Sequence, residues 1–186
     1  MIRALLLLLF AVTAYGDDAA RRSGFSPTGR AEARPTFDIP DVEVTTHEGK
    51  KVRFYSDLVK GRTVAVNFIY TNCSTICPSS GALFSALQKE HGRVQFISIS
   101  IEPKVDTPAK LAEWSRRFRT TPRWTLVTGT PEAIETLVKS FGQTTARPQD
   151  HTPLTIVGSD VTHTWSKLYG FPGPEKIAKL VSEVSQ

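Results

Sequence analysis

The stretch TVAVNFIYTNCSTICP, residues 63–78, joins an apolar run to two cysteines and a proline. Residues 63–69 are almost continuously apolar and rich in β-branched side chains, a pattern typical of a strand buried on both faces. Pro78 suits the first turn of a helix, because the N–H group that proline lacks would have no partner there. We therefore predict a strand, a cysteine loop and a helix in succession, with Gly92 at the end of the helix.

The same alternation continues beyond this stretch. Apolar runs at 94–101 and 124–127 predict two further buried strands. Each run is followed by a Thr-Pro pair that can begin a helix, first at Thr107 and then at Thr130. Strands that alternate with helices in this way predict a parallel sheet covered by helices on both faces.

The C-terminal part of the sequence predicts a hairpin and a last helix. Residues 154–157 and 161–165 are strand-like and flank a turn at 158–160, and Gly173 precedes an amphipathic segment. The hairpin adds an antiparallel edge, so we expect an α/β fold with a central mixed sheet. This succession, with cysteines after the first buried strand, is the thioredoxin-like layout.

The N-terminal part of the domain predicts a second hairpin. Residues 37–44 indicate an edge strand, residues 47–50 a glycine turn and residues 52–54 a return strand. We expect this N-terminal β-hairpin to extend the thioredoxin-like sheet.

The composition is that of one globular domain. Of the 186 residues, 40% are hydrophobic and 22% charged, close to globular averages, which excludes a collagen-like, coiled-coil or wholly disordered chain. The net charge is +5, from 23 basic and 18 acidic residues scattered along the chain. Because the basic residues form no cluster, we expect no nucleic-acid partner.

The first 34 residues predict a secretory signal and a leader. Met1–Arg3 is a positively charged start, and residues 4–15 are apolar but too few to span a bilayer. Small residues place signal cleavage before Asp17, with an uncleaved membrane anchor as the alternative. Residues 17–34 are poor in apolar side chains and predict a flexible leader, which leaves 35–186 as the thioredoxin-like domain. We expect export to the periplasm.

The two cysteines are the candidate reactive groups. If Cys73 and Cys77 lie on one helical turn, their Cα atoms are roughly 6 Å apart, which permits a disulfide or a shared metal ion. Cys77 stands beside Pro78 at a helix start, where free N–H groups and the helix dipole favour a thiolate. A static structural disulfide is the alternative, although closing so short a loop stabilises a fold little.

A histidine could supply a third metal ligand. His47, His91 and His163 lie in predicted turns or on the last hairpin, and we interpret them as solvated or packing residues. His151 immediately precedes a core strand, whose start neighbours the cysteine loop in a thioredoxin-like sheet. Two thiolates and one imidazole suit Cu(I), whereas zinc would need a fourth ligand. Asp150 is either a group that orients His151 or a solvated loop acid.

Three segments together resemble the signatures of the Sco/SenC family: 67–78, 102–108 and 150–152. The likeness extends from about Phe37 to Val184. It implies a thioredoxin-like copper chaperone of the cell envelope that helps assemble the binuclear copper site of cytochrome c oxidase. It also implies a ligand set, carried over residue by residue, of Cys73, Cys77 and His151.

Two positions depart from the family pattern. Many relatives have proline where Ser74 stands and aspartate where Glu102 stands. The longer side chain of Glu102 puts in doubt any family role for that acid in tuning the site. The longer membrane anchor of many relatives is also absent from this sequence, so we expect a free soluble protein.

Three functions remain open on these residues. The first is a metallochaperone that holds copper and passes it to the oxidase subunit with the binuclear copper site. The second is an enzyme, a thiol–disulfide oxidoreductase in which Cys73 and Cys77 form a redox pair and His151 is a base or a bystander. The third is a thiol peroxidase. Envelope thiol reductants or copper donors are the other expected partners, and we expect a monomer.

Two further features concern the fold. Pro153 stands where many thioredoxin-like proteins have a cis proline, and the sequence leaves its isomer open. We expect Trp114, Trp124 and Trp165 to be core residues.

Overall fold

The computed structural model describes residues 35–143, 147–150 and 152–185, which therefore exclude the predicted signal and leader. The strands among these residues are β1 (Glu43–Thr46), β2 (Lys51–Arg53), β3 (Thr63–Ile69), β4 (Gln95–Ser100), β5 (Trp124–Thr128), β6 (Leu154–Ser159) and β7 (Thr164–Tyr169). The longer helices are α1 (Ile76–Glu90), α2 (Pro108–Phe118), α3 (Pro131–Ser140) and α4 (Pro174–Val184), and the short ones are a π-helix, η2 (Phe54–Val59), and a 3-10 helix, η3 (Pro148–Asp150).

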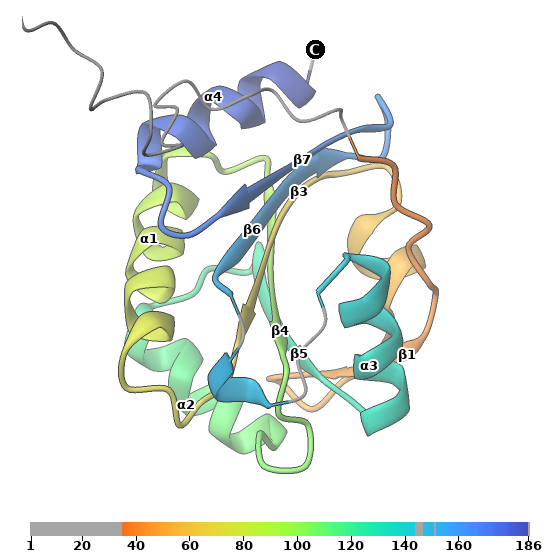
Figure 1. The fold of residues 1–186 in the computed structure, drawn as a ribbon, viewed down its shortest axis with the longest axis vertical. Helices are drawn as coiled ribbons and strands as arrows, with labels where there is room; N and C mark the ends of the chain where they lie inside the picture. The colour runs from red at the N-terminus through yellow and green to blue at the C-terminus, as the bar shows by residue number, and fades with distance from the viewer. Residues whose placement is uncertain (1–34, 144–146, 151, 186) are drawn as a thin grey trace, which may run out of the picture. The chain divides into compact units, whose positions relative to one another are not determined.

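All the described strands belong to one mixed sheet, in the order β2-β1-β5-β4-β3-β6-β7 (Figure 1). β3, β4 and β5 run parallel to one another at its centre, and β6 and β7 continue it as antiparallel strands. The register pairs Asn67 of β3 with Ser98 of β4 and with Thr155 of β6. The predicted α/β fold with a central mixed sheet is thus confirmed.

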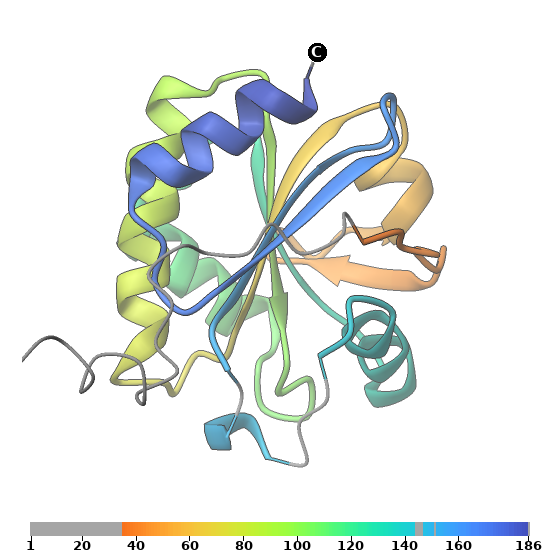
Figure 2. The ribbon, with the colours of Figure 1, turned by 45° about the horizontal axis from the view of Figure 1, so that its top comes forward.

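Helices cover both faces of the sheet, as predicted (Figures 1 and 2). α1, α2 and α4 pack on one face, and their core contains Trp114 and Trp124. α3 and η2 pack on the other face, and its core contains Trp165. All three tryptophans are at most 5% exposed, which confirms them as core residues.

The predicted helix starts at the Thr-Pro pairs are confirmed. The side-chain oxygen of Thr107 accepts a hydrogen bond from the N–H of Lys110 at 3.3 Å, and that of Thr130 accepts one from Ala133 at 3.2 Å. Each hydroxyl satisfies an N–H group that has no partner within its helix. These two caps set the residues at which α2 and α3 begin, after the loops that follow the carboxyl ends of β4 and β5.

The N-terminal hairpin is present, but the prediction of its edge was wrong. β1 begins only at Glu43 and lies between β2 and β5, so β2 forms the edge of the sheet. Pro40 cannot donate to a strand ladder, and the preceding segment packs through Phe37 instead. The Phe37 ring lies 5.3 Å from the ring of Phe141 and 5.5 Å from that of Trp165, between centroids.

The C-terminal hairpin is also present, with its turn later than predicted. β6 continues through Gly158 and Ser159, and β7 begins at Thr164. Gly158 lies within β6, where it pairs with Trp165 of β7. The indole of Trp165 leaves no room for a side chain at position 158, so a glycine is needed there. α1 ends at Glu90, slightly before the predicted Gly92.

The isomer of the peptide bond before Pro153 and the character of the helices complete the description of the fold. No peptide bond between described residues is cis, so the bond before Pro153 is trans. Among the helices of residues 35–185 that the structure describes, none combines the length and the apolar character needed to cross a bilayer.

Candidate metal centre

The two cysteines meet where β3 leads into α1. Cys73 lies in the connecting loop and Cys77 in the first turn of the helix, and both are free thiols. Their exposed fractions are 7% and 1%. The N–H of Cys77 donates a hydrogen bond to the Cys73 sulfur over 3.3 Å. The structure therefore brings the predicted pair into direct contact.

Cys73 is the thiol that favours ionisation. Burial acts to raise its pKa, but hydrogen bonds from the Cys77 N–H and thiol, the Thr75 N–H and the Tyr70 hydroxyl outweigh burial and lower the pKa to about 6. A free N–H group at a helix start stabilises a thiolate strongly. At neutral pH the loop cysteine is consequently a thiolate.

Cys77 behaves in the opposite way, and the prediction that its place at the helix start favours a thiolate was wrong. Burial is the largest cause that raises the pKa of Cys77 well above its usual range, and its hydrogen bond to Cys73 adds to the effect. The backbone N–H of Cys77, in the first helical turn, donates to the sulfur of Cys73 and not to the sulfur of Cys77. Cys77 therefore stays a protonated thiol and donates to its neighbour.

Tyr70 completes the surroundings of the Cys73 sulfur. Its hydrogen bond to Cys73, followed by burial, raises the pKa of the phenol to about 12. The phenol therefore keeps its proton at neutral pH. This role of Tyr70 could not be predicted from the motif 67–78, because nothing local in the sequence shows that its hydroxyl reaches the sulfur.

A buried carboxylate holds the cysteine loop. Asp106 is fully buried and accepts hydrogen bonds from the N–H and the hydroxyl of Thr71 and, at 2.7 Å, from the hydroxyl of Ser100. Thr71 precedes Cys73 by two residues, and Ser100 ends β4. The carboxylate thus joins the cysteine loop to the neighbouring strand. This role could not be predicted from the sequence, because the partners of Asp106 are distant from it along the chain.

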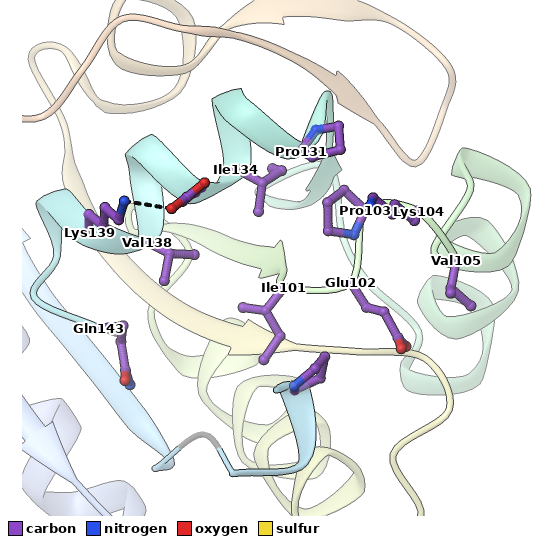
Figure 3. Close-up of a pocket in the computed structure, with 12 residues that line it drawn as sticks. Ile101, Glu102, Pro103, Lys104, Val105, Pro131, Ile134, Val138, Lys139 and Gln143 are labelled. Atoms are coloured by element: carbon purple, nitrogen blue, oxygen red, sulfur yellow. Dashed lines mark ion pairs between the residues drawn. The ribbon is translucent and has the colours of Figure 1, made fainter. Parts of the chain in front are cut away.

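A cleft of about 720 Å³ lies beside this site, between the β4–α2 loop and α3 (Figure 3). Ile134 and Val138 of α3 face Ile101 across it. Glu102 lines the same cleft, and one of its carboxylate oxygens is buried without a hydrogen-bond donor among the described residues. Its charge also contributes to the raised pKa of Tyr70, so Glu102 lies close enough to the site to act on it electrostatically.

The predicted third ligand, His151, lies outside the described residues. The segments on either side of it are described. Thr155 pairs with Asn67 near the end of β3, and the carbonyl of Pro153 accepts a hydrogen bond from the N–H of Gly170 at 2.9 Å. The start of β6 therefore lies at the same end of the sheet as the cysteine loop.

Asp150 has a partner among the described residues. Its carboxylate forms an ion pair with the Arg147 guanidinium at 2.6 Å, and both side chains are largely exposed. This geometry supports the interpretation of Asp150 as a solvated loop acid.

The other histidines take no part in the described site. The ring of His47 accepts a hydrogen bond from the N–H of Leu126 at 3.3 Å, and burial lowers its pKa. His163 is exposed in the turn between β6 and β7, and His91 follows the end of α1. Within the described part of the chain, no three histidine, cysteine or carboxylate side chains cluster as a metal site.

Comparison with known proteins points to one family. The SCO1/SenC family profile matches residues 31–168. A SCO1 protein homologue of Bacillus subtilis is 31% identical over 120 residues, which cover 61% of this chain and 61% of the relative. The chain thus spans about three fifths of that relative's length.

Solved structures confirm the fold. A SCO1/SenC family lipoprotein from Bacillus anthracis superposes with a TM-score of 0.73 at 26% identity, covering 84% of this chain and all of the other. BsSco, described as having a disulfide switch and belonging to a family of cytochrome c oxidase assembly proteins, has a TM-score of 0.70 at 24% identity and covers 82% and 96%. Arabidopsis thaliana ScoI, solved with copper bound, has a TM-score of 0.66 at 21% identity and covers 82% and 98%.

Proposed function

Because this chain belongs to the SCO1/SenC family, we propose that it is a copper chaperone of the cell envelope. It holds Cu(I) through Cys73, Cys77 and His151. It then delivers the ion to the binuclear copper site of cytochrome c oxidase, or prepares the thiols of that site. The oxidase subunit with that site is the acceptor, and envelope copper donors or thiol reductants supply the copper or the electrons.

One observation carries this proposal: two free thiols in direct contact, of which one is a thiolate at neutral pH. Soft thiolate ligands select Cu(I), and an imidazole completes a three-ligand set. Cys73 needs no deprotonation before it binds the ion, since its pKa is about 6. Cys77 releases its proton as the ion binds, so copper affinity rises with pH.

The low number of ligands suits a protein that must give its ion away. A three-coordinate Cu(I) has room for an incoming thiolate of the acceptor, so transfer can proceed by ligand exchange. The cysteine loop lies at the end of the sheet, where a partner can approach. Arabidopsis thaliana ScoI, a protein of the same fold, has been solved with copper bound, which supports this choice of cargo.

An anaerobic Cu(I) titration of the reduced protein against a competing chelator tests the proposal. We expect one bound ion and a strong loss of affinity in both Cys73→Ser and His151→Ala. His163→Ala is the matched control, because His163 lies in the exposed turn at the opposite end of the sheet. Copper binding that is indifferent to His151→Ala would contradict the three-ligand site.

The place of action is a separate part of the proposal. Cleavage before Asp17 releases a monomeric periplasmic protein with a leader, 17–34, and a thioredoxin-like domain, 35–186. The intact mass of the exported protein tests this, with a chain that begins at Asp17 as the expected result. A chain that keeps residues 1–16 in the membrane fraction would favour the uncleaved anchor.

A second function is favoured by the unequal acidity of the two thiols. The Cys73 thiolate can attack an acceptor disulfide and form a mixed disulfide, and Cys77 then displaces the acceptor to close the Cys73–Cys77 disulfide. Two electrons pass to the acceptor, which becomes a dithiol. Cys77 supplies one of its two protons and water supplies the other, because Cys73 is already a thiolate. This exchange does not require His151, so His151→Ala should weaken copper binding strongly and leave the rate of thiol exchange unchanged.

A further inference from the structure

The carboxylate of Asp106 has an unusual setting for a charged group. It is fully buried, and none of the ion pairs among the described residues involves it. Its charge is compensated by hydrogen bonds from Thr71 and Ser100. Burial of a carboxylate costs several kcal/mol, so such a group must be held by good donors.

The donors come from two segments that the carboxylate binds together. Thr71 contributes both its N–H and its hydroxyl, so its backbone and its side chain are fixed at once. The hydroxyl of Ser100 donates to Oδ2 of the carboxylate, which also accepts from the Thr71 N–H, and it accepts from the N–H of Glu102 at 3.2 Å. Asp106 is itself anchored, because its N–H donates to the carbonyl of Glu102 at 2.9 Å.

The fixed residue lies inside the turn that presents the loop cysteine. The N–H of Cys73 donates to the carbonyl of Tyr70 at 3.2 Å and closes a turn with Thr71 at its second position. The Cys73 sulfur then accepts from the N–H of Cys77. A rotation at Thr71 would move the sulfur away from this N–H group and from the second thiol.

We propose that Asp106 is a positioning residue of the copper site, which holds the Tyr70–Cys73 turn so that both sulfurs face one ion. This inference rests on the proposed function. Ligands held in place before binding lose less conformational freedom when the ion arrives, which raises affinity. Groups that orient metal ligands without touching the metal typically account for a 10–100-fold difference in affinity.

Isosteric variants separate positioning from folding. Asp106→Asn keeps the shape but removes the negative charge and replaces one acceptor oxygen by an NH2 group, which cannot accept a hydrogen bond from Thr71 or Ser100. Thr71→Val removes only the side-chain donor, and Thr71→Ser restores it. Asp160→Asn is the matched control, because Asp160 also accepts from a loop N–H and a hydroxyl, at the opposite end of the sheet.

The first measurement is Cu(I) affinity by chelator competition on reduced protein that circular dichroism shows to be folded. We expect roughly a 10–100-fold loss for Asp106→Asn and Thr71→Val, and wild-type affinity for Thr71→Ser and Asp160→Asn. Wild-type affinity in Thr71→Val would overturn the proposal. An equal loss in Asp160→Asn would do the same, since it would trace the effect to general destabilisation.

A second measurement needs no copper and therefore separates this inference from the proposed function. In the reduced protein, iodoacetamide should alkylate Cys73 far faster than Cys77. The ratio of the Cys73 rate to the Cys77 rate should fall about tenfold or more in Thr71→Val and recover in Thr71→Ser. If the wild-type protein binds no Cu(I), the proposed function fails, and this ratio alone decides whether Asp106 positions Cys73. A ratio unchanged in Thr71→Val would overturn the positioning role.

Discussion

Two aspartates hold loops at opposite ends of β3, in different surroundings. Asp106 binds Thr71 beyond the last residue of the strand and is fully buried. Asp160 accepts from the N–H of Gly61 at 2.7 Å, before the first residue, and from the Tyr55 hydroxyl at 2.9 Å, and it is only half-buried. The same bonding pattern thus serves a dry site at one end and a solvated turn at the other.

The molecule depends on hydrogen bonds more at the Asp106 end of β3 than at the Asp160 end. If Asp160 is removed, water can accept hydrogen bonds from the groups that donated to it. If Asp106 is removed, the groups that donated to it have no substitute acceptor. At the Asp160 end, close packing of Trp165 against Gly158 holds the hairpin instead.

The largest effect is expected for Asp106→Ala. Three donors around a fully buried carboxylate lose their acceptor, so the free energy of unfolding should fall by about 4 kcal/mol. Asp160→Ala, in which water solvates the freed groups, should cost about 1 kcal/mol. Urea unfolding of both variants measures the difference, and equal losses would contradict the contrast between a dry end and a wet end.

Gly158→Ala should be next in size. The added Cβ would lie 2.0 Å from the Trp165 ring, which is 4% exposed and cannot move aside freely. We expect a loss of about 3 kcal/mol in the free energy of unfolding, with Cu(I) affinity unchanged in the folded protein. Gly92→Ala is the control, because no atom lies within 4 Å of its new Cβ. A loss of copper affinity in Gly158→Ala would show that the two ends are coupled.

The stability of the reduced protein should rise with pH through the ionisation of Cys73. Its pKa is about 6 in the folded state against 9.0 ordinarily, so between these values the unfolded chain binds a proton that the folded chain has released. From pH 6.5 to 8.5 the free energy of unfolding should gain about 2 kcal/mol, and this gain is lost as pH falls through 6.

Urea unfolding of Cys73→Ser, which lacks this thiol, is the comparison for the pH series. The difference in the free energy of unfolding between Cys73→Ser and the wild type should become smaller as the pH falls toward 6. Above pH 9 the raised pKa of Cys77 acts in the opposite direction, because the unfolded chain then loses a proton that the folded chain retains. A difference that is flat between pH 6.5 and 8.5 would contradict the thiolate assignment.

The smallest effect is expected for Arg147→Ala. This variant removes the exposed ion pair with Asp150, so the free energy of unfolding should change by less than about 0.5 kcal/mol. Cu(I) affinity should also remain at the wild-type value, because the buried Asp106 rather than this pair holds the site end of the sheet. Weaker copper binding would instead indicate that the Arg147–Asp150 pair orients the loop before β6.

The order of strands and helices and the cysteine pair could both be predicted from local patterns in the amino-acid sequence. The apolar run at 63–69 and the Thr-Pro pairs at 107 and 130 act within one strand or one helical turn, so they can be recognised locally. The positions of the hairpins were less predictable. Gly158 has the composition of a turn, and only the indole of Trp165 above it explains why it lies in a strand.

Which thiol ionises, and which groups hold it in place, depends on contacts between segments that are distant in sequence. Cys77 has the helix start that favours a thiolate, yet its burial keeps it protonated, while its N–H serves Cys73. Asp106 has its role only because the pairing of β3 with β4 brings Thr71 and Ser100 to one carboxylate. Thr71 is 35 residues from Asp106 in sequence. Burial and long-range hydrogen bonds depend on the packing of the whole sheet, and a local sequence pattern contains neither.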